Sequence, residues 1–202
     1  MPNVTTRLVV GISGASGAIY GVRLLEVLKS KGVETHLIIT PWGEEMIRVE
    51  TDMSPDDVKN LATQVYDDKD MAARVSSGSF KFDGMVVIPC SMKTISAIAN
   101  GYASTLLVRA ADVTMKEGRK LIVVPRETPV NQVHLKNMLQ LAQMGVTVLP
   151  AMPGFYHRPK SMGDLVDHVV GKVLDQFNIE HNLYKRWQPM RDQQHLADQK
   201  HY

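Results

Sequence analysis

Short apolar runs alternate along this chain with segments of helical periodicity, and this alternation leaves few folds open. The apolar runs are rich in β-branched residues and nearly continuous, as in strands that are buried on both faces. They cover residues 7–12, 35–40, 84–90, 120–126 and 146–151. The helical segments cover residues 18–31, 133–144 and 161–177. The pattern predicts an α/β fold with a doubly wound parallel sheet and helices on both faces.

The length of 202 residues suits one domain of ordinary size. With 44% hydrophobic and 22% charged residues, the composition is that of a globular protein with its own core. We predict a single domain over residues 1–185 and a polar C-terminal tail over residues 186–202, where apolar periodicity ends.

Charge and cysteine content exclude several kinds of partner. The net charge is only +2 and the basic residues are spread along the chain, so we expect neither nucleic acid nor a membrane as partner. The single cysteine, Cys90, allows no intramolecular disulfide and indicates a reducing compartment. No signal-peptide pattern opens the sequence, and the apolar runs are too short to span a membrane. We therefore expect a cytoplasmic protein.

The loop after the first predicted strand is rich in glycine but differs from a dinucleotide motif. It reads GISGASGAIYG from Gly11 to Gly21, which lacks the spacing G-x-G-x-x-G. The second strand ends at Thr40 and the first acid beyond it is Glu44, so the acid that holds an adenosine ribose is missing. The loop suits one phosphate or the edge of a flat ring. A turn that merely permits close packing is an equal alternative.

The third predicted strand leads into the sequence PCSMKT, residues 89–94. Ser91 and Thr94 offer hydroxyls and Lys93 offers a cation where a helix begins, which together suit a phosphate. The alternative is a helix-capping serine beside an exposed lysine. We expect Cys90 to be packed rather than reactive.

Further polar side chains follow the later strands. Arg109, Asp112 and Lys116 share one helix face, as phosphate-binding groups or as a solvated ion-pair ladder. Arg126 and Glu127 follow the fourth strand, where a cation beside a carboxylate allows acid–base chemistry.

After the fifth strand, Tyr156 and His157 lie in a loop between two prolines. His157 has no second ligand at metal-binding spacing, so we predict no metal site. The strand ends together predict a site for two small phosphorylated ligands, one of them flat.

Five motifs in order resemble those of the flavin prenyltransferases, the UbiX family. They read GISGASGAIYG, PCSMKT, RAADVTMKEGRK, VPRETP and MPGFYHRP. The resemblance implies a flavodoxin-like, Rossmann-like domain that binds reduced FMN and dimethylallyl phosphate. Such an enzyme joins the prenyl group to N5 and C6 of the flavin and releases phosphate without a metal. The resemblance also implies a homododecamer with active sites between subunits, which delivers prenylated FMN to a UbiD-type decarboxylase.

The resemblance assigns roles to individual residues. The residues that would hold FMN are Gly14, Ala15, Ser16, Thr40, Ser91, Met92, Lys93, Thr94 and Arg126. Those that would hold dimethylallyl phosphate are Arg109, Lys116, Tyr156 and Lys172. Glu127 would be the acid–base residue, with Ser16 and Lys116 as the other catalytic groups. Thr40 stands where the family commonly has serine.

Two alternatives share parts of this interpretation. A cysteine-peptide decarboxylase would have the same fold and FMN, but it depends on an active-site His and a P-x-M-N motif, where this chain has PRET. A non-catalytic FMN-binding or assembly subunit of an aromatic acid decarboxylase is the second alternative. Such a subunit would not need Glu127 together with Lys116 and Lys172.

Overall fold

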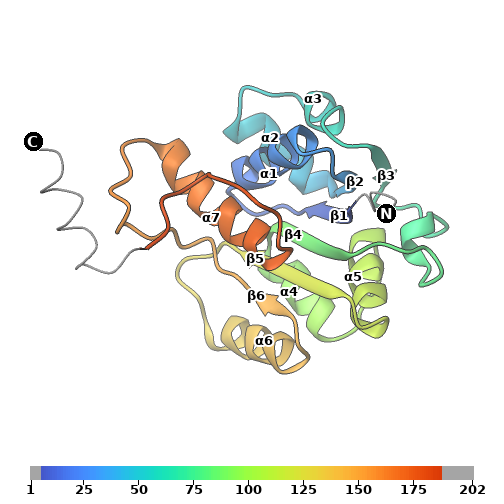
Figure 1. Ribbon diagram of the computed structural model, residues 1–202. Helices are drawn as coiled ribbons and strands as arrows, with labels where there is room; N and C mark the ends of the chain where they lie inside the picture. Colours follow the sequence, from blue (N-terminus) through green and yellow to red (C-terminus); the bar gives the residue numbers. More distant parts are fainter. Residues whose placement is uncertain (1–5, 188–202) are drawn as a thin grey trace, which may run out of the picture. The chain divides into compact units, whose positions relative to one another are not determined.

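The computed structural model describes residues 6–187 (Figure 1). Contacts within the chain group it into two compact units, Met1–Ala151 and Met152–Tyr202. The first unit contains the entire described sheet, and the second contains helix α7 (Met162–Gln176). Of the predicted tail, Arg186 and Trp187 belong to the described residues, while residues 188–202 lie outside them.

The sheet of the first unit has six strands, all paired in parallel. The strands are β1 (Arg7–Ile12), β2 (Glu34–Ile39), β3 (Gln64–Asp67), β4 (Gly84–Cys90), β5 (Lys120–Pro125) and β6 (Thr147–Val148). Their order is β3-β2-β1-β4-β5-β6, with β1 and β4 at the centre (Figure 1). This order confirms the predicted doubly wound sheet. The direction of winding reverses between β1 and β4, so a ligand site is expected at the carboxyl ends of these two strands.

The five predicted strands are present, and β3 is an addition that the apolar pattern did not predict. Its sequence QVYD is exposed at both ends and only half-buried between them. An edge strand of this kind forms no continuous apolar run, which explains the omission.

The three predicted helices are also confirmed, as α1 (Ala18–Ser30), α6 (Gln132–Gln143) and α7. The first unit also contains α2 (Pro41–Glu50), α3 (Pro55–Lys59), α4 (Met92–Ala99) and α5 (Leu106–Lys116). Local signals fix where several of these begin. Thr40 caps α2 by accepting from Gly43 N at 3.1 Å, with Pro41 in the first turn.

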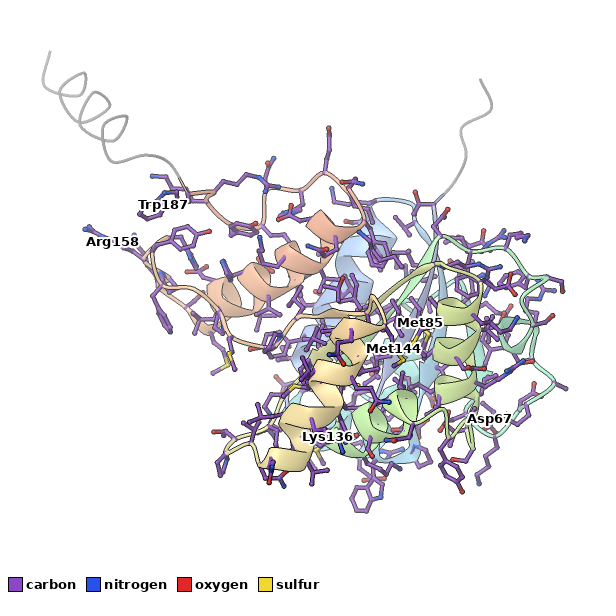
Figure 2. All side chains as sticks on the ribbon, turned by 90° about the horizontal axis from the view of Figure 1, so that it is seen from below. Asp67, Met85, Lys136, Met144, Arg158 and Trp187 are labelled. Carbon is purple, nitrogen blue, oxygen red and sulfur yellow. The ribbon has the colours of Figure 1, made fainter. Side chains whose placement is uncertain are left out.

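Helices cover both faces of the sheet. Apolar side chains of α4 and α5 join those of β1, β4 and β5 in one buried cluster, which includes Met85 (Figure 2). On the other side, α1 packs on β1, β2 and β4. Both faces of the central strands are therefore buried, as their nearly continuous apolar sequences require.

The second unit is built around α7. Ser161 caps this helix, since its Oγ accepts from Asp164 N at 3.2 Å while Asp164 accepts from Ser161 N at 3.1 Å. The predicted apolar stripe is buried at Val166, Val169 and Val173. No described helix in either unit is both long and apolar enough to cross a membrane.

Candidate active site

Ser13 joins the carboxyl ends of the two central strands. Its backbone N–H and its Oγ both donate to Pro89 O, at 3.2 and 3.0 Å, and Oγ accepts from Ser91 N at 2.8 Å. The side chain lies in the interior, since Ser13 is 1% exposed. The glycine-rich loop is therefore fixed against the first turn of α4, a link that the sequence did not reveal.

The N-terminus of α4 has a helix-capping serine beside an exposed lysine, which the sequence offered as the alternative to a phosphate site. Ser91 Oγ accepts from Thr94 N at 3.3 Å and lies 3.0 Å from Thr94 Oγ1, while Lys93 is exposed beside them. Two hydroxyls and a cation at a helix N-terminus form a site for an anion such as a phosphate.

A cavity of about 520 Å³ opens at this edge of the sheet. Most of its lining residues follow the ends of β1, β2, β3 and β4, and one precedes α5; they are Gly14, Thr40, Pro41, Trp42, Asp68, Lys69, Ser91, Lys93, Thr94 and Thr105. The volume lies in the range of small-molecule sites, roughly 300–1,000 Å³. Trp42 is 68% exposed and offers an aromatic surface on which a flat ring can stack.

The cavity fits a flavin mononucleotide. It brings together five of the nine predicted FMN residues, namely Gly14, Thr40, Ser91, Lys93 and Thr94. The α4 N-terminus suits the phosphate, and Trp42 with the bare loop at Gly14 suits a flat ring. From the sequence, Trp42 lies two residues after Thr40, where it is expected to affect the fit around FMN, but it is assigned no binding role there.

Ala15 and Met92, also predicted to hold FMN, are not among the residues that line this cavity. Ala15 is buried, and Met92 packs against the apolar cluster of the first unit. Cys90 belongs to this cluster and is fully buried, and burial raises the pKa of its thiol, which keeps it uncharged. The thiol is packed, as the sequence predicted.

Gly14 has no room for a side chain. A Cβ at this position would collide with Trp42 Cβ and lie 3.3 Å from Trp42 Cα. We expect Gly14→Ala to displace Trp42 and to weaken FMN binding about tenfold, with a lower melting temperature, because overpacking costs about 1–3 kcal/mol. Gly163→Ala is the matched control, since its nearest contact, Ser161 Oγ, is 3.5 Å away. Titration of FMN into both variants checks the prediction, which an unchanged affinity of the Gly14 variant would contradict.

Glu50 closes the turn at the start of α1. Its Oε2 accepts from Gly17 N at 2.7 Å and from Ala18 N at 2.9 Å. Burial acts to raise the pKa of Glu50, but hydrogen bonds from Ser16, Gly17 and Ala18 outweigh it and lower the pKa. A carboxylate therefore already occupies this helix N-terminus, which leaves the edge of a flat ring and the close-packing turn as the open interpretations of the loop.

The role of Glu50 was missed because it stands at the last position of α2, far along the chain from the loop it holds. Only the packing of α1 on α2 brings it there. No motif in the sequence marks such a contact.

The Glu50 contact gives a pH prediction. Because the folded state lowers the pKa of Glu50, its ionised form adds stability above the ordinary carboxyl pKa, and this stability is lost as pH falls through the lowered value. We expect Glu50→Gln to melt below wild type at about pH 7 and equal to it near pH 2. Glu45→Gln, an exposed acid on the same helix, is the control and should melt with wild type at about pH 7, because exposed ion pairs such as that with Arg48 add only about 0–1 kcal/mol. Melting curves across this pH range test the prediction, and a difference that persists at the lowest pH would contradict it.

Arg126 and Glu127 lie at the same edge as the loop. Arg126 Nε donates to Ser16 O at 3.0 Å, which ties the end of β5 to the loop after β1. Glu127 is exposed, and its Oε1 accepts from Thr128 N at 3.1 Å. The structure therefore brings Ser16, Arg126 and Glu127 to one edge, as predicted.

Lys116 lies at the opposite edge of the sheet. It ends α5 just before Lys120 opens β5, whereas Glu127 follows the end of β5. A six-residue strand is about 20 Å long, so Lys116 and Glu127 of one chain are separated by at least the depth of the sheet. The Lys116 ammonium lies 2.5 Å from Glu117 Oε1.

Arg109 has a carboxylate partner as well. Its Nη1 lies 2.6 Å from Asp112 Oδ2, and its Nε donates to Ser76 O at 3.2 Å. Arg109 and Asp112 share the helix face that the sequence predicted. Neither Arg109 nor Lys116 lines the 520 Å³ cavity.

The second unit carries the other two predicted substrate residues. The ring of Tyr156 lies edge-on to Trp187 at 5.5 Å and to His168 at 5.8 Å between centroids. Lys172 Nζ lies 3.8 Å from Asp175 Oδ2. Figure 2 labels Arg158 and Trp187 at the same end of this unit. Among residues 6–187, no group of three His, Cys, Asp or Glu side chains is arranged to hold a metal ion.

Comparisons with known proteins identify the family of this chain. The family model described as Flavoprotein matches residues 2–174. A probable UbiX-like flavin prenyltransferase of Bacillus subtilis (strain 168) is 54% identical over 187 residues, which cover 93% of this chain and 92% of that protein.

Two solved structures share the fold closely. The crystal structure of AnUbiX (PadA1) in complex with FMN and dimethylallyl pyrophosphate has a TM-score of 0.90 at 45% identity, covering 92% of this chain and 98% of that one. A dodecameric FMN-dependent UbiX-like decarboxylase from Escherichia coli O157:H7 has a TM-score of 0.90 at 52% identity, covering 91% of this chain and 100% of that one. With this identity over nearly its whole described length, the chain belongs to the flavoprotein family, among the UbiX-like flavin prenyltransferases.

Proposed function

We propose that this protein transfers the dimethylallyl group of dimethylallyl phosphate to N5 and C6 of reduced FMN. The observation that carries the proposal is the cavity at the β1–β4 edge, where a phosphate site at α4 and an aromatic wall at Trp42 lie next to the loop held by Arg126. Similarity to a structure that contains both FMN and dimethylallyl pyrophosphate supports it.

The residues of the cavity would hold FMN in a fixed orientation. Ser91, Thr94 and Lys93 would bind its phosphate at the α4 N-terminus, and Gly14 would let the ring approach the backbone. When bound, reduced FMN supplies the nucleophilic atoms N5 and C6. The loop residue Ser16, held through its carbonyl by Arg126, would face the flavin edge.

The cations of the chain act on the departing phosphate. As the allylic C–O bond breaks, the bonding electrons leave with the phosphate, and Arg109, Lys116 and Lys172 would stabilise the charge that builds there. Glu127 would accept the proton released when N5 is alkylated and would donate a proton to the prenyl group as the bond to C6 forms, a task for a positioned carboxylate. Tyr156 and its aromatic neighbours would exclude water from the cation-like allyl group.

This assignment requires more than one chain per site. Lys116 cannot reach Glu127 of its own chain across the sheet, so we propose that each site takes Lys116 from a neighbouring subunit. A homododecamer, as in the similar Escherichia coli protein, would supply that neighbour. The product, prenylated FMN, would be delivered to a UbiD-type decarboxylase. A cytoplasmic location suits the single, buried thiol of Cys90.

An anaerobic incubation with reduced FMN and dimethylallyl phosphate tests the proposal. We expect the flavin to gain the mass of one C5H8 unit while inorganic phosphate is released in equal amount. Mass spectrometry of the extracted flavin and a phosphate assay measure the two products. Tight FMN binding without a change in mass would instead favour the non-catalytic FMN-binding subunit.

A further inference from the structure

The residues that follow α7 fold back onto this helix and converge on one carboxylate. We call residues 178–187 the C-terminal segment. Tyr184 Oη donates to Asp175 Oδ2 at 2.6 Å, and His181 Nε2 lies 3.1 Å from Asp175 Oδ1. Arg186 Nη2 donates to Oδ1 at 2.7 Å and Nη1 to Oδ2 at 3.3 Å. Three side chains of the segment are thus anchored at Asp175.

A glycine in α7 makes this anchoring possible. A Cβ at Gly171 would lie 2.6 Å from two carbons of the Tyr184 ring and 2.7 Å from His181 Cε1. Both rings therefore lie against the bare backbone of Gly171, and the His181 side chain is 1% exposed. Gly171 and Asp175 lie one turn apart on the same face of α7. The bare backbone at Gly171 makes room for the two rings, and the carboxylate of Asp175 binds their polar atoms.

The anchored segment and Asp175 each contact one residue that the proposed function places at the substrate. Its last described residue, Trp187, lies edge-on to Tyr156 at 5.5 Å. The Tyr184 ring lies 4.9 Å from His168, whose own ring lies 5.8 Å from Tyr156. Asp175 also faces the Lys172 ammonium at 3.8 Å. One carboxylate thus supports Tyr156 through the segment and Lys172 directly.

Asp175 and its partner Tyr184 keep the same charge state over a wide range of pH. Burial acts to raise the pKa of Asp175, but hydrogen bonds from Arg186, Tyr184 and His181 outweigh it and lower the pKa to about 2. Burial and the hydrogen bond to Asp175 raise the pKa of Tyr184 to about 12. The carboxylate stays ionised and the phenol stays protonated over the whole range in which an enzyme operates.

We propose that Asp175 is a positioning residue for prenyl transfer: by anchoring the C-terminal segment on α7, it holds Tyr156 and Lys172 in the arrangement that binds dimethylallyl phosphate. This inference rests on the proposed function, because that function gives Tyr156 and Lys172 their roles. Asp175 itself touches neither reactant.

Asp175→Asn is the first test, since it keeps the size of the side chain but loses its charge. We expect KM for dimethylallyl phosphate to rise about tenfold, with a smaller change in kcat and no change in FMN affinity, because charged hydrogen bonds of the anchor are lost. Trypsin should cleave after Lys185 and Arg186 faster than in wild type, as mass spectrometry of the peptides would show.

Two further variants separate positioning from general damage. Gly171→Ala leaves the carboxylate in place but displaces the rings of Tyr184 and His181, so it should raise KM and trypsin cleavage in the same way. Glu180→Gln removes a negative charge from an exposed position of the same segment and should change neither. If Asp175→Asn folds poorly, Tyr184→Phe keeps the carboxylate, removes one donor and should give a smaller rise in KM.

The outcomes are distinguishable. If the wild type is active and the Asp175 variant is cleaved faster by trypsin but has an unchanged KM, the positioning role is overturned. An unchanged rate of trypsin cleavage overturns the anchor itself. A wild type that transfers no prenyl group refutes the proposed function, and the positioning role then falls with it.

Discussion

Glu127→Gln is expected to lower the rate of prenyl transfer by about 10²- to 10⁴-fold, the usual contribution of a general acid or base. Glutamine keeps the shape of the side chain and can still accept the hydrogen bond from Thr128 N. It cannot take up a proton at neutral pH, so only the proton transfer is lost. FMN affinity should be unchanged, because Glu127 does not line the cavity that suits FMN.

The measurement is kcat at saturating FMN and dimethylallyl phosphate, together with the Kd of FMN. Glu26→Gln is a suitable control, since this α1 acid is paired with Arg23 and belongs to no part of the site. It should retain full activity. A Glu127 variant with the wild-type rate would refute the acid–base role, and one that no longer binds FMN would assign Glu127 to binding instead.

Predictions from the sequence succeeded where the physical cause is local. The apolar runs of β1, β4 and β5 are long because both faces of these strands are buried. Nearly every residue of each strand is therefore apolar, and the sequence alone shows this. The capping of α4 by Ser91 is likewise a matter of adjacent residues. By contrast, β3 is an edge strand with exposed ends and leaves no such pattern.

The site was predicted less completely, because several of its contacts join distant parts of the chain. Glu50 reaches the loop at Gly17 only through the packing of α2 on α1, and Ser13 reaches Ser91 only across the β1–β4 pair. Trp42 enters the cavity because Gly14, opposite it, has no side chain. A motif identifies residues by their order, whereas these contacts depend on the tertiary fold.

The sequence motifs also do not indicate which chain of an assembly supplies each residue of a site. Lys116 and Glu127 belong to neighbouring motifs in the sequence, yet they lie at opposite edges of the sheet in one chain. Within one chain, Arg109 pairs with Asp112 and Lys116 pairs with Glu117. If both groups serve one reaction, they must come from different chains.

Complementation between inactive variants should therefore restore activity. Lys116→Met and Glu127→Gln are each expected to lose about 10²-fold or more of the prenyl-transfer rate as pure assemblies. In assemblies of equal amounts of both chains, about a quarter of the sites should combine an intact Glu127 with an intact Lys116 from another chain. The activity of mixed assemblies, isolated through a different tag on each chain, measures this recovery.

The double variant Lys116→Met/Glu127→Gln, mixed with wild type, tests in the same assay whether both residues instead act within one chain. If both residues acted within one chain, half of the sites in an equal mixture would stay active, and the two single variants would recover nothing. If each site draws Lys116 from a neighbour, random assembly leaves about a quarter of the sites active in both mixtures. Equal activity of the two mixtures thus supports a site shared between chains. Activity in the wild-type mixture alone would show that Lys116 reaches Glu127 within its own chain, which would contradict their separation along β5.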